Sequence, residues 1–358
     1  MKKVKFAVVG AGWISQEAFL PSIPQLDNAE VTAIVTGDVA KAQKLADFYS
    51  IPHVFSYDQY GEMLSRKLVD AVYIALPNHL HAQYTIEAAR AGVHALVEKP
   101  LSKTIAESEA MIAAAETHGV KLMTAYRLHS EPATIQFMDL ISSGAIGVPR
   151  LFTSPFGFSI APANHRLQAI AWGGPLQDLG VYCVNAARHV FMAEPTEVVA
   201  MSGRKPDDAR FSEADECVSA TLRFPGDAIA VFSSSFGMAP TDKLLVVGST
   251  GQIEMENAYR FEFGRKITLT TESGVRVIDV PHVDNFSGQA AYFADCILKD
   301  VQPVPDGHEG LADMRVLVAI EEASRSGVKQ LLPKSSRKVP PLVGTSREFP
   351  TTTRRLLL

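Results

Sequence analysis

The stretch VKFAVVGAGWIS, residues 4–15, decides the fold, because a short apolar run leads directly into a glycine pair that opens a helical pattern. Gly10 permits a tight turn, and Gly12 lets the backbone approach a pyrophosphate at the start of a helix. Ser15 stands in place of the third glycine of the usual fingerprint. The stretch predicts a dinucleotide-binding turn, with a purely structural turn as the alternative. The residues expected to bind the dinucleotide here are Gly10, Gly12, Trp13 and Ile14.

Up to about residue 125, short apolar runs alternate with segments of helical length. Parallel strands joined by right-handed helical crossovers explain this alternation. We therefore predict an α/β domain over residues 1–125, with a doubly wound parallel sheet. Its expected strands are residues 4–10, 31–36, 71–76, 94–97 and 121–125, and its expected helices are residues 39–49, 79–91 and 104–118.

A different pattern begins after about residue 148, where strand-like runs are separated by Gly, Pro and Asp turns too short for helical crossovers. We predict an α+β domain over residues 126–333, with helices on one face of a large, mostly antiparallel open sheet. A second subunit covering the other face predicts a homodimer or homotetramer. Residues 334–358 are expected to form an extended tail. The predicted strands are 197–202, 216–223, 228–236, 244–248, 252–256, 266–271 and 275–280, and the helices are 131–143, 176–190, 288–299 and 311–326.

Composition narrows the class of protein. At 358 residues, with 47% hydrophobic and 20% charged residues, the chain is long enough for two hydrophobic cores. A net charge of −5 with interspersed signs provides no basic patch for nucleic acid or an anionic membrane. No apolar run approaches the roughly 20 residues that span a bilayer. The three cysteines are far apart and the histidines lack metal-ligand spacing, so we expect no metal site and a reducing, cytoplasmic location.

The end of the second predicted strand bears on the choice of cofactor. NAD-selective proteins usually place an acidic residue there for the ribose 2′-hydroxyl, whereas this strand ends in Thr36-Gly37-Asp38. Lys41 follows one turn into the next helix, near enough to balance a 2′-phosphate. Asp38 is either a displaced acid or the N-cap of that helix, and we favour the cap. We therefore expect NADP(H), with NAD(H) as the alternative, and assign Thr36, Gly37 and Lys41 to its site.

Three further motifs lie beyond this strand: Leu76-Pro77-Asn78-His79-Leu80-His81, Glu98-Lys99-Pro100, and GGPLQDLGVY at residues 173–182. In this order, they resemble the glucose–fructose oxidoreductase/inositol dehydrogenase (Gfo/Idh/MocA) family over residues 4–330. Thr36-Gly37-Asp38, Tyr126-Arg127 and Tyr182 place the resemblance nearest to its glucose–fructose oxidoreductase branch. The resemblance implies a Rossmann domain that binds NAD(P) and a second domain that binds a sugar, lactone or polyol.

The resemblance also implies roles on the cofactor side. Leu76, Pro77 and Asn78 would line the nicotinamide-ribose side after the fourth strand, with His81 nearby on the following helix. Glu98 and Lys99 would stand at the end of the fifth strand, with Lys99 between nicotinamide and substrate. Pro100 would follow a cis peptide bond.

The second domain would contribute the substrate side, with Asp178 and Tyr182 projecting from one helix into a cleft that Tyr126 and Arg127 also line. Asp178 and Tyr182 are one helical turn apart, so their side chains can face the same way. Free tyrosine, with a pKa of about 10, is a poor base near neutrality, but a nearby ammonium favours the phenolate. The resemblance therefore predicts Tyr182 and Lys99 as a proton-transfer pair, with Asp178 orienting the substrate. Many family members carry histidine at the position of Tyr182.

Each assignment has a structural alternative. Lys99 could lie in solvent, Tyr182 could pack in a helix interface, and Asp178 could cap its helix. Arg127 could bind the cofactor or the substrate, or pair with a surface carboxylate. Arg166, in an irregular loop before the glycine pair, could reach the cofactor.

Three functions follow as hypotheses. The first is an NADP-dependent dehydrogenase or reductase of a sugar, lactone or polyol. The second is a nucleotide-binding regulatory protein without turnover, which would be expected to lose Lys99 or its partners. The third is a glycosidase with a transient NAD redox step, a chemistry also known in the family.

Overall fold

The computed structural model describes residues 2–333, 338–342 and 344–358. Contacts within the chain define two compact units, each assembled from segments that are far apart in the sequence. Unit 1 consists of Met1–Glu131, Val283–Leu311 and Thr345–Leu358, and unit 2 consists of Pro132–His282 and Ala312–Gly344. The sequence-based boundaries at residues 125 and 333 assume continuous domains, because periodicity does not reveal which unit a late helix joins. Within the predicted tail, residues 334–337 and 343 lie outside the described residues.

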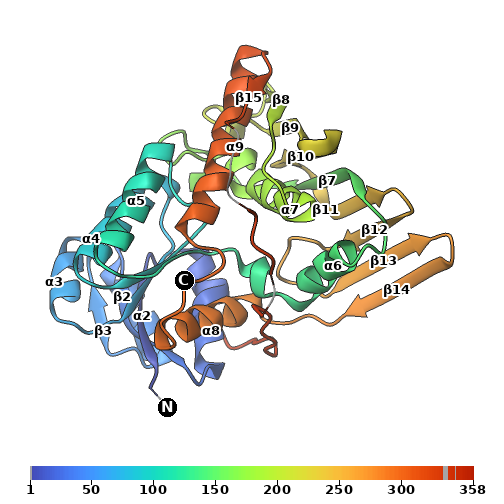
Figure 1. Cartoon of the computed structure of the whole chain (residues 1–358). Helices are drawn as coiled ribbons and strands as arrows, with labels where there is room; N and C mark the ends of the chain where they lie inside the picture. The colour runs from blue at the N-terminus through green and yellow to red at the C-terminus, as the bar shows by residue number, and fades with distance from the viewer. Residues whose placement is uncertain (1, 334–337, 343) are drawn as a thin grey trace. The chain divides into compact units, whose positions relative to one another are not determined.

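Unit 1 is built on a six-stranded parallel sheet with the order β3-β2-β1-β4-β5-β6, as predicted for a doubly wound fold (Figure 1). The order reverses between β1 and β4, and ligands of such sheets bind beyond the carboxyl ends of the strands at this point. All four residues of β4 are buried, as expected for a strand covered on both faces. The strands are β1 (Val4–Val9), β2 (Ala29–Val35), β3 (His53–Phe55), β4 (Ala71–Ile74), β5 (His94–Val97) and β6 (Leu122–Thr124).

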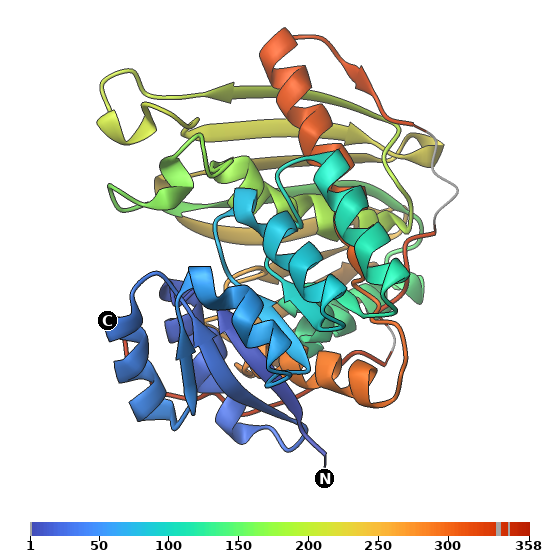
Figure 2. The ribbon, with the colours of Figure 1, turned by 90° about the vertical axis from the view of Figure 1, so that its left-hand side faces the viewer.

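Helices cover this sheet, and α4 and α5 lie side by side (Figure 2). A capping box begins α5, because Thr104 and Glu107 each accept a backbone N–H from the other, at 3.0 and 3.1 Å. The late helix α8 joins the same core through the Phe293 ring, 6.3 Å from that of Phe6. Residues 13–25 are continuously helical and include α1 (Leu20–Ser22). The other helices of unit 1 are α2 (Val39–Tyr49), α3 (Tyr60–Ser65), α4 (His81–Arg90), α5 (Ile105–Thr117) and α8 (Asn285–Leu298).

Unit 2 is built on a nine-stranded sheet with the order β14-β13-β12-β11-β7-β10-β9-β8-β15. Its pairs are antiparallel except for β7 with β10, which confirms a mostly antiparallel sheet. Sequence patterns missed the central strand β7, because Pro155 and Gly157 within it are residue types typical of turns. The strands are β7 (Pro149–Ser159), β8 (Glu197–Gly203), β9 (Cys217–Arg223), β10 (Ile229–Ser235), β11 (Gly237–Gly248), β12 (Gly251–Glu256), β13 (Arg265–Thr271), β14 (Gly274–Val280) and β15 (Gln330–Leu331).

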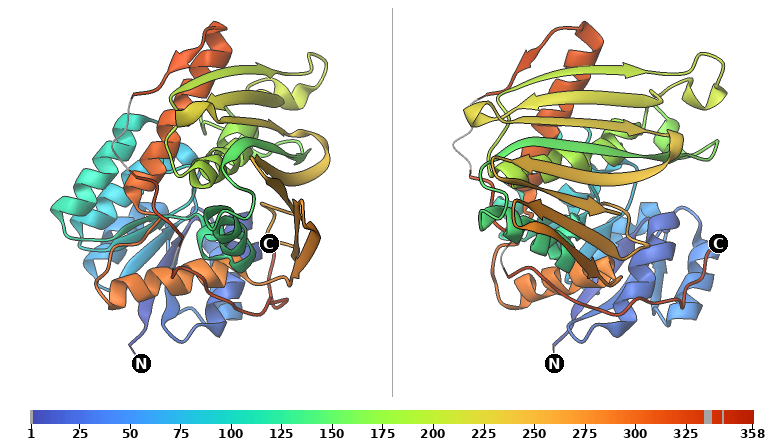
Figure 3. Two further views of the ribbon diagram at one scale, coloured as in Figure 1. Left: turned by 45° about the vertical axis from the view of Figure 1, so that its right-hand side comes forward. Right: turned by 90° about the vertical axis from the view of Figure 1, so that its right-hand side faces the viewer.

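The nine-stranded sheet has one face packed against helices (Figure 3). The helices α6 (Pro132–Ser142) and α7 (Val181–Phe191) contact its strands, and α9 (Gly307–Ser326) is the last helix in the chain order. On β8, Val198 is buried, whereas Val199 and Met201, on the opposite face of the strand, are 46% and 79% exposed. Alternation of this kind confirms one covered face and one open face.

Candidate active site

The turn after β1 has the geometry that its glycines predicted. Gly10 has a φ of 98°, and a Cβ on it would lie 2.5 Å from the Ala75 carbonyl oxygen. Only glycine fits this backbone without strain. The Ser15 hydroxyl donates to the Gly10 carbonyl at 2.6 Å, and the Gln16 side-chain amide donates to the Ala11 carbonyl at 2.7 Å. Side chains of the following helix therefore hold the turn in place.

Gly12 differs from Gly10, because no atom lies within 4 Å of the point where its Cβ would stand. Trp13 beside it is 53% exposed. An open backbone position at the start of a helix fits the pyrophosphate of a dinucleotide, whose charge favours the N–H groups there.

The end of β2 carries neutral and basic groups. Thr36 is buried, and its hydroxyl hydrogen-bonds Tyr57, which also contacts the Gly37 backbone. Asp38 caps α2 by accepting the Lys41 N–H at 2.9 Å, as predicted. The Lys41 side chain, in the first turn of α2, has no ion pair among the described residues. The sequence reasoning missed Tyr57, since it comes from the segment after β3.

The segments after β4 and β5 are tied together by His81. Its ring is fully buried, and its nitrogens lie 3.0 and 2.9 Å from the Pro100 and Leu76 carbonyl oxygens. Burial lowers the pKa of His81, against the effect of these hydrogen bonds. The imidazole thus lies between the Leu76–Asn78 segment and the Lys99-Pro100 segment and contacts the backbone of both. The predicted cis bond between Lys99 and Pro100 is present.

Glu98 and Lys99 directly follow β5. The Tyr73 hydroxyl donates to Glu98 at 2.6 Å, and burial raises the pKa of Glu98 while Lys99 acts in the opposite direction. Because parallel strands share one carboxyl edge, Lys99, Thr36 and the Gly10–Gly12 turn all follow strands at the same edge of one sheet.

Tyr126 and Arg127 follow β6 and are both buried, at 2% and 5% exposure. The Tyr126 ring stacks on His129 with centroids 5.2 Å apart. Arg127 donates to Asn285 at 3.1 Å and lies over the Phe286 ring. Both of these Arg127 partners come from α8, a pairing that the sequence did not indicate.

In unit 2, Asp178 lies in a π-helical turn, Leu176–Gly180, that continues into α7. Asp178 pairs with Arg166 at 3.1 Å, so the irregular segment around Arg166 is joined to this helix. Tyr182 follows one turn later at 9% exposure, with the rings of Phe156 and Tyr259 about 6 Å away. Asp178 and Tyr182 thus share one helix of unit 2, while Lys99 belongs to unit 1.

Glu321, which the sequence reasoning missed, supports this helix. Its carboxylate accepts the Trp172 indole N–H at 2.9 Å and the Gln177 amide at 2.6 Å. Burial raises the pKa of Glu321, and both hydrogen bonds oppose that rise. Trp172 has a φ of 51°, a left-handed conformation uncommon for a bulky residue. Glu321 therefore anchors both sides of the glycine pair that precedes Asp178.

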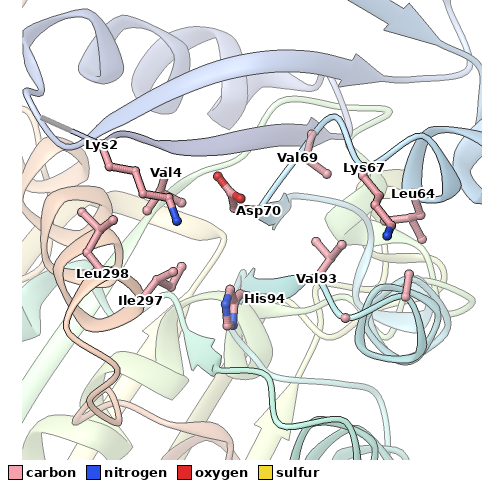
Figure 4. A pocket seen from close by; sticks show the side chains of 12 residues that line it. Lys2, Val4, Leu64, Lys67, Val69, Asp70, Val93, His94, Ile297 and Leu298 are labelled. Carbon is pink, nitrogen blue, oxygen red and sulfur yellow. The ribbon is translucent and has the colours of Figure 1, made fainter.

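A cavity of about 470 Å³ in unit 1 lies at the opposite edge of the parallel sheet (Figure 4). Lys2, Lys67, Asp70 and His94 line it, close to the amino ends of β1, β4 and β5. It is therefore separate from the carboxyl-edge residues described above. Among the described residues, no group of His, Cys, Asp and Glu is arranged to hold a metal ion, and no helix is long and apolar enough to cross a membrane.

The doubly wound sheet, its glycine turn and the second unit define an NAD(P)-dependent oxidoreductase. Residues 4–126 match the model of an oxidoreductase family with an NAD-binding Rossmann fold, and residues 135–254 match the GFO/IDH/MocA C-terminal domain. The chain belongs to the Gfo/Idh/MocA oxidoreductase family.

Several named relatives are similar over most of their length. A D-xylose 1-dehydrogenase [NADP(+)] of Haloarcula marismortui is 32% identical over 90% of this chain and 91% of its own. An aldose–aldose oxidoreductase from Caulobacter crescentus, solved with glycerol, superposes with a TM-score of 0.88 and 33% identity, covering 92% of this chain and all of that one. A 3-ketoreductase from Actinomadura kijaniata, solved with NADP and TDP-benzene, has a TM-score of 0.83 and 27% identity, covering 90% and 98%.

Proposed function

We propose that this protein is an NADP-dependent sugar dehydrogenase that moves a hydride between nicotinamide C4 and a carbinol or carbonyl carbon, with an aldose as the first substrate to test. The observation that carries the proposal is the position of Lys99, which follows β5 at the same sheet edge as the Gly10–Gly12 turn. Relatives that act on D-xylose with NADP(+) support the substrate class and the cofactor. Thr36 and Lys41 at the end of β2 also fit a 2′-phosphate better than a free ribose.

Each residue of the proposed site has its own role in the reaction. When bound, the oxidised cofactor supplies the hydride acceptor. The Lys99 ammonium donates a hydrogen bond to the reacting oxygen and stabilises negative charge on it. The phenolate form of Tyr182 accepts the hydroxyl proton as the carbinol is oxidised, and positioned acid–base catalysis of this kind contributes about 10²–10⁴ in rate. Asp178, held by Arg166, orients the sugar by accepting one of its hydroxyl hydrogens.

The atoms balance in the oxidative direction. The sugar carbon loses its hydrogen with two electrons to the nicotinamide, its C–O bond becomes a carbonyl, and the hydroxyl proton leaves through Tyr182 to solvent. An aldose oxidised at its anomeric carbon becomes a lactone, and the cofactor becomes NADPH.

The test is the formation of reduced cofactor, NADPH from NADP+ or NADH from NAD+, across a panel of aldoses and polyols, with Lys99→Met beside the wild type. Lys103→Met is the matched control, because it removes a lysine four residues later that has no assigned role in binding or catalysis. We expect sugar-dependent turnover to fall at least a hundredfold in Lys99→Met and to persist in the control. NADPH affinity should persist in both. Equal turnover by Lys99→Met and the wild type would remove Lys99 from the mechanism.

The same assay separates the two alternatives. A regulatory protein would bind NADPH but reduce no cofactor with any sugar in the panel. A glycosidase would release a leaving group from a glycoside with no net change in the cofactor. NADPH formation with a free aldose contradicts both.

The open face of the nine-stranded sheet supports a further proposal, that two copies of the chain associate there. Exposed apolar side chains include Met201 on β8 and Leu331 on the adjoining edge strand β15, at 79% and 74% exposure, and Val275 on the opposite edge strand β14, at 66%. Clusters of such side chains mark protein interfaces. We expect the wild type to have the mass of two or four chains in solution, and we expect Met201→Lys to lower that mass. A monomeric wild type would contradict the proposal.

A further inference from the structure

The end of the described chain lies on the dinucleotide-binding half of the molecule. Thr345–Leu358, here called the tail, belongs to unit 1 although it follows unit 2 in the sequence. It passes α8, where Arg347 pairs with Asp295 at 3.0 Å, and continues along the N-terminal helices (Figure 3). Arg354 then lies over the Phe48 ring, 5.1 Å from its centroid, at the end of α2. The tail therefore follows a defined path across unit 1.

The last residues of the tail reach the helix that opens at the glycine turn. The Leu358 N–H donates to the Gln16 side-chain oxygen at 2.7 Å. The nitrogen of the same amide group donates to the carbonyl of Ala11, the residue between the two glycines, also at 2.7 Å. Gln16 is 3% exposed, so these bonds are shielded from water. One buried amide thus joins the tail to the phosphate-binding turn.

A charge pair accompanies this hydrogen-bond relay. Arg355 forms an ion pair with Glu17, whose side chain is only 14% exposed. Glu17 lies in the first turn of the π-helical segment after the glycines. A carboxylate near a helix start opposes the binding of a phosphate there, because like charges repel in a poorly hydrated site. Arg355 supplies the compensating positive charge.

We propose that the tail completes the dinucleotide site, with Arg355 neutralising Glu17 and Gln16 bracing the turn between Leu358 and Ala11. This inference rests on the dinucleotide binding contained in the proposed function. It assigns Gln16, Glu17 and Arg355 as positioning residues, since they act on the turn and its electric field. The affected ligand is the pyrophosphate of NADP(H).

The experiment measures the NADPH dissociation constant by fluorescence titration of the full chain. Arg355→Gln leaves Glu17 uncompensated and should weaken binding about threefold to tenfold, less at high salt. The double variant Glu17→Gln with Arg355→Gln should return to within about twofold of the wild type, because neither charge remains. Arg355→Lys keeps the charge and should bind almost as the wild type does. Deletion of Leu356–Leu358 removes the hydrogen bond between Leu358 and Gln16 while Arg355 is kept. This variant should release NADPH faster.

Arg354→Gln is the matched control, because the Arg354 guanidinium contacts Phe48 and not the turn. The melting temperatures of all variants, measured in parallel, separate a local effect from unfolding. Wild-type affinity in both Arg355→Gln and the deletion would overturn the tail proposal. Failure of the wild type itself to bind NADPH would instead overturn the proposed function.

Discussion

Replacing each glycine of the turn by alanine should separate folding from cofactor binding. At Gly10, the φ of 98° costs an alanine about 1–2 kcal/mol. Its methyl group would lie 2.5 Å from the Ala75 carbonyl oxygen. The backbone shift that relieves such crowding typically costs about 1–3 kcal/mol, so the total loss is about 2–5 kcal/mol. At roughly 2–4 °C per kcal/mol, Gly10→Ala should melt about 4–20 °C below the wild type.

Gly12→Ala should behave in the opposite way. Its methyl group meets no protein atom within 4 Å, so the melting temperature should stay within about 2 °C of the wild type. The methyl group would stand where the backbone approaches the pyrophosphate, and the NADPH dissociation constant should rise at least about tenfold, or 1.4 kcal/mol. Thermal unfolding without ligand and NADPH fluorescence titration measure the two effects. Unchanged affinity in Gly12→Ala, or unchanged stability in Gly10→Ala, would refute the assignment of these roles.

Three further predictions concern specificity, stability and pH. Thr36→Asp combined with Lys41→Ala should weaken NADPH binding about tenfold and favour NADH, which titration with both cofactors checks. Arg188 is fully buried between Glu194 and Asp313, at 2.7 and 2.6 Å, so Arg188→Met should cost about 3–5 kcal/mol in a denaturant titration. The exposed pair of Arg325 with Glu322 is its control, and Arg325→Met should cost at most about 1 kcal/mol. Because burial raises the pKa of Glu321, the folded state binds its proton more tightly, and stability should fall as pH rises from the ordinary carboxyl range through that raised pKa. Glu321→Gln should remove this slope, and a variant with the wild-type slope would contradict the account.

Much of the fold could be predicted from sequence because local rules governed it. The apolar runs of β1, β4 and β5 are covered on both faces, so burial preserved their pattern. The cap at Asp38 depends only on neighbouring residues, and the glycine pair is a local signal of the turn at Gly10; both are present. The strand β7 was missed because proline and glycine lie within it, and only its pairing with β10 and β11 makes it a strand.

The candidate site shows the same division. The side chains that follow the strands, from Thr36 to Lys99, could be identified from the sequence because each comes shortly after a predicted strand. Their supporting partners could not, because Tyr57, Asn285 and Glu321 come from segments that only folding brings near Thr36, Arg127 and Gln177. A hydrogen bond between residues that are 21 to 158 positions apart, as in these three pairs, leaves no periodic trace in a sequence.

By itself, the sequence determined the parallel sheet, the glycine turn and the residues offered for chemistry, since each follows from short-range periodicity and backbone freedom. Only the tertiary structure decided that α8 and the tail join the first unit and that Arg355 faces Glu17. The physical reason is that chain entropy permits many ways to place a late segment, and the choice among them depends on the burial and charge that it finds on another part of the surface.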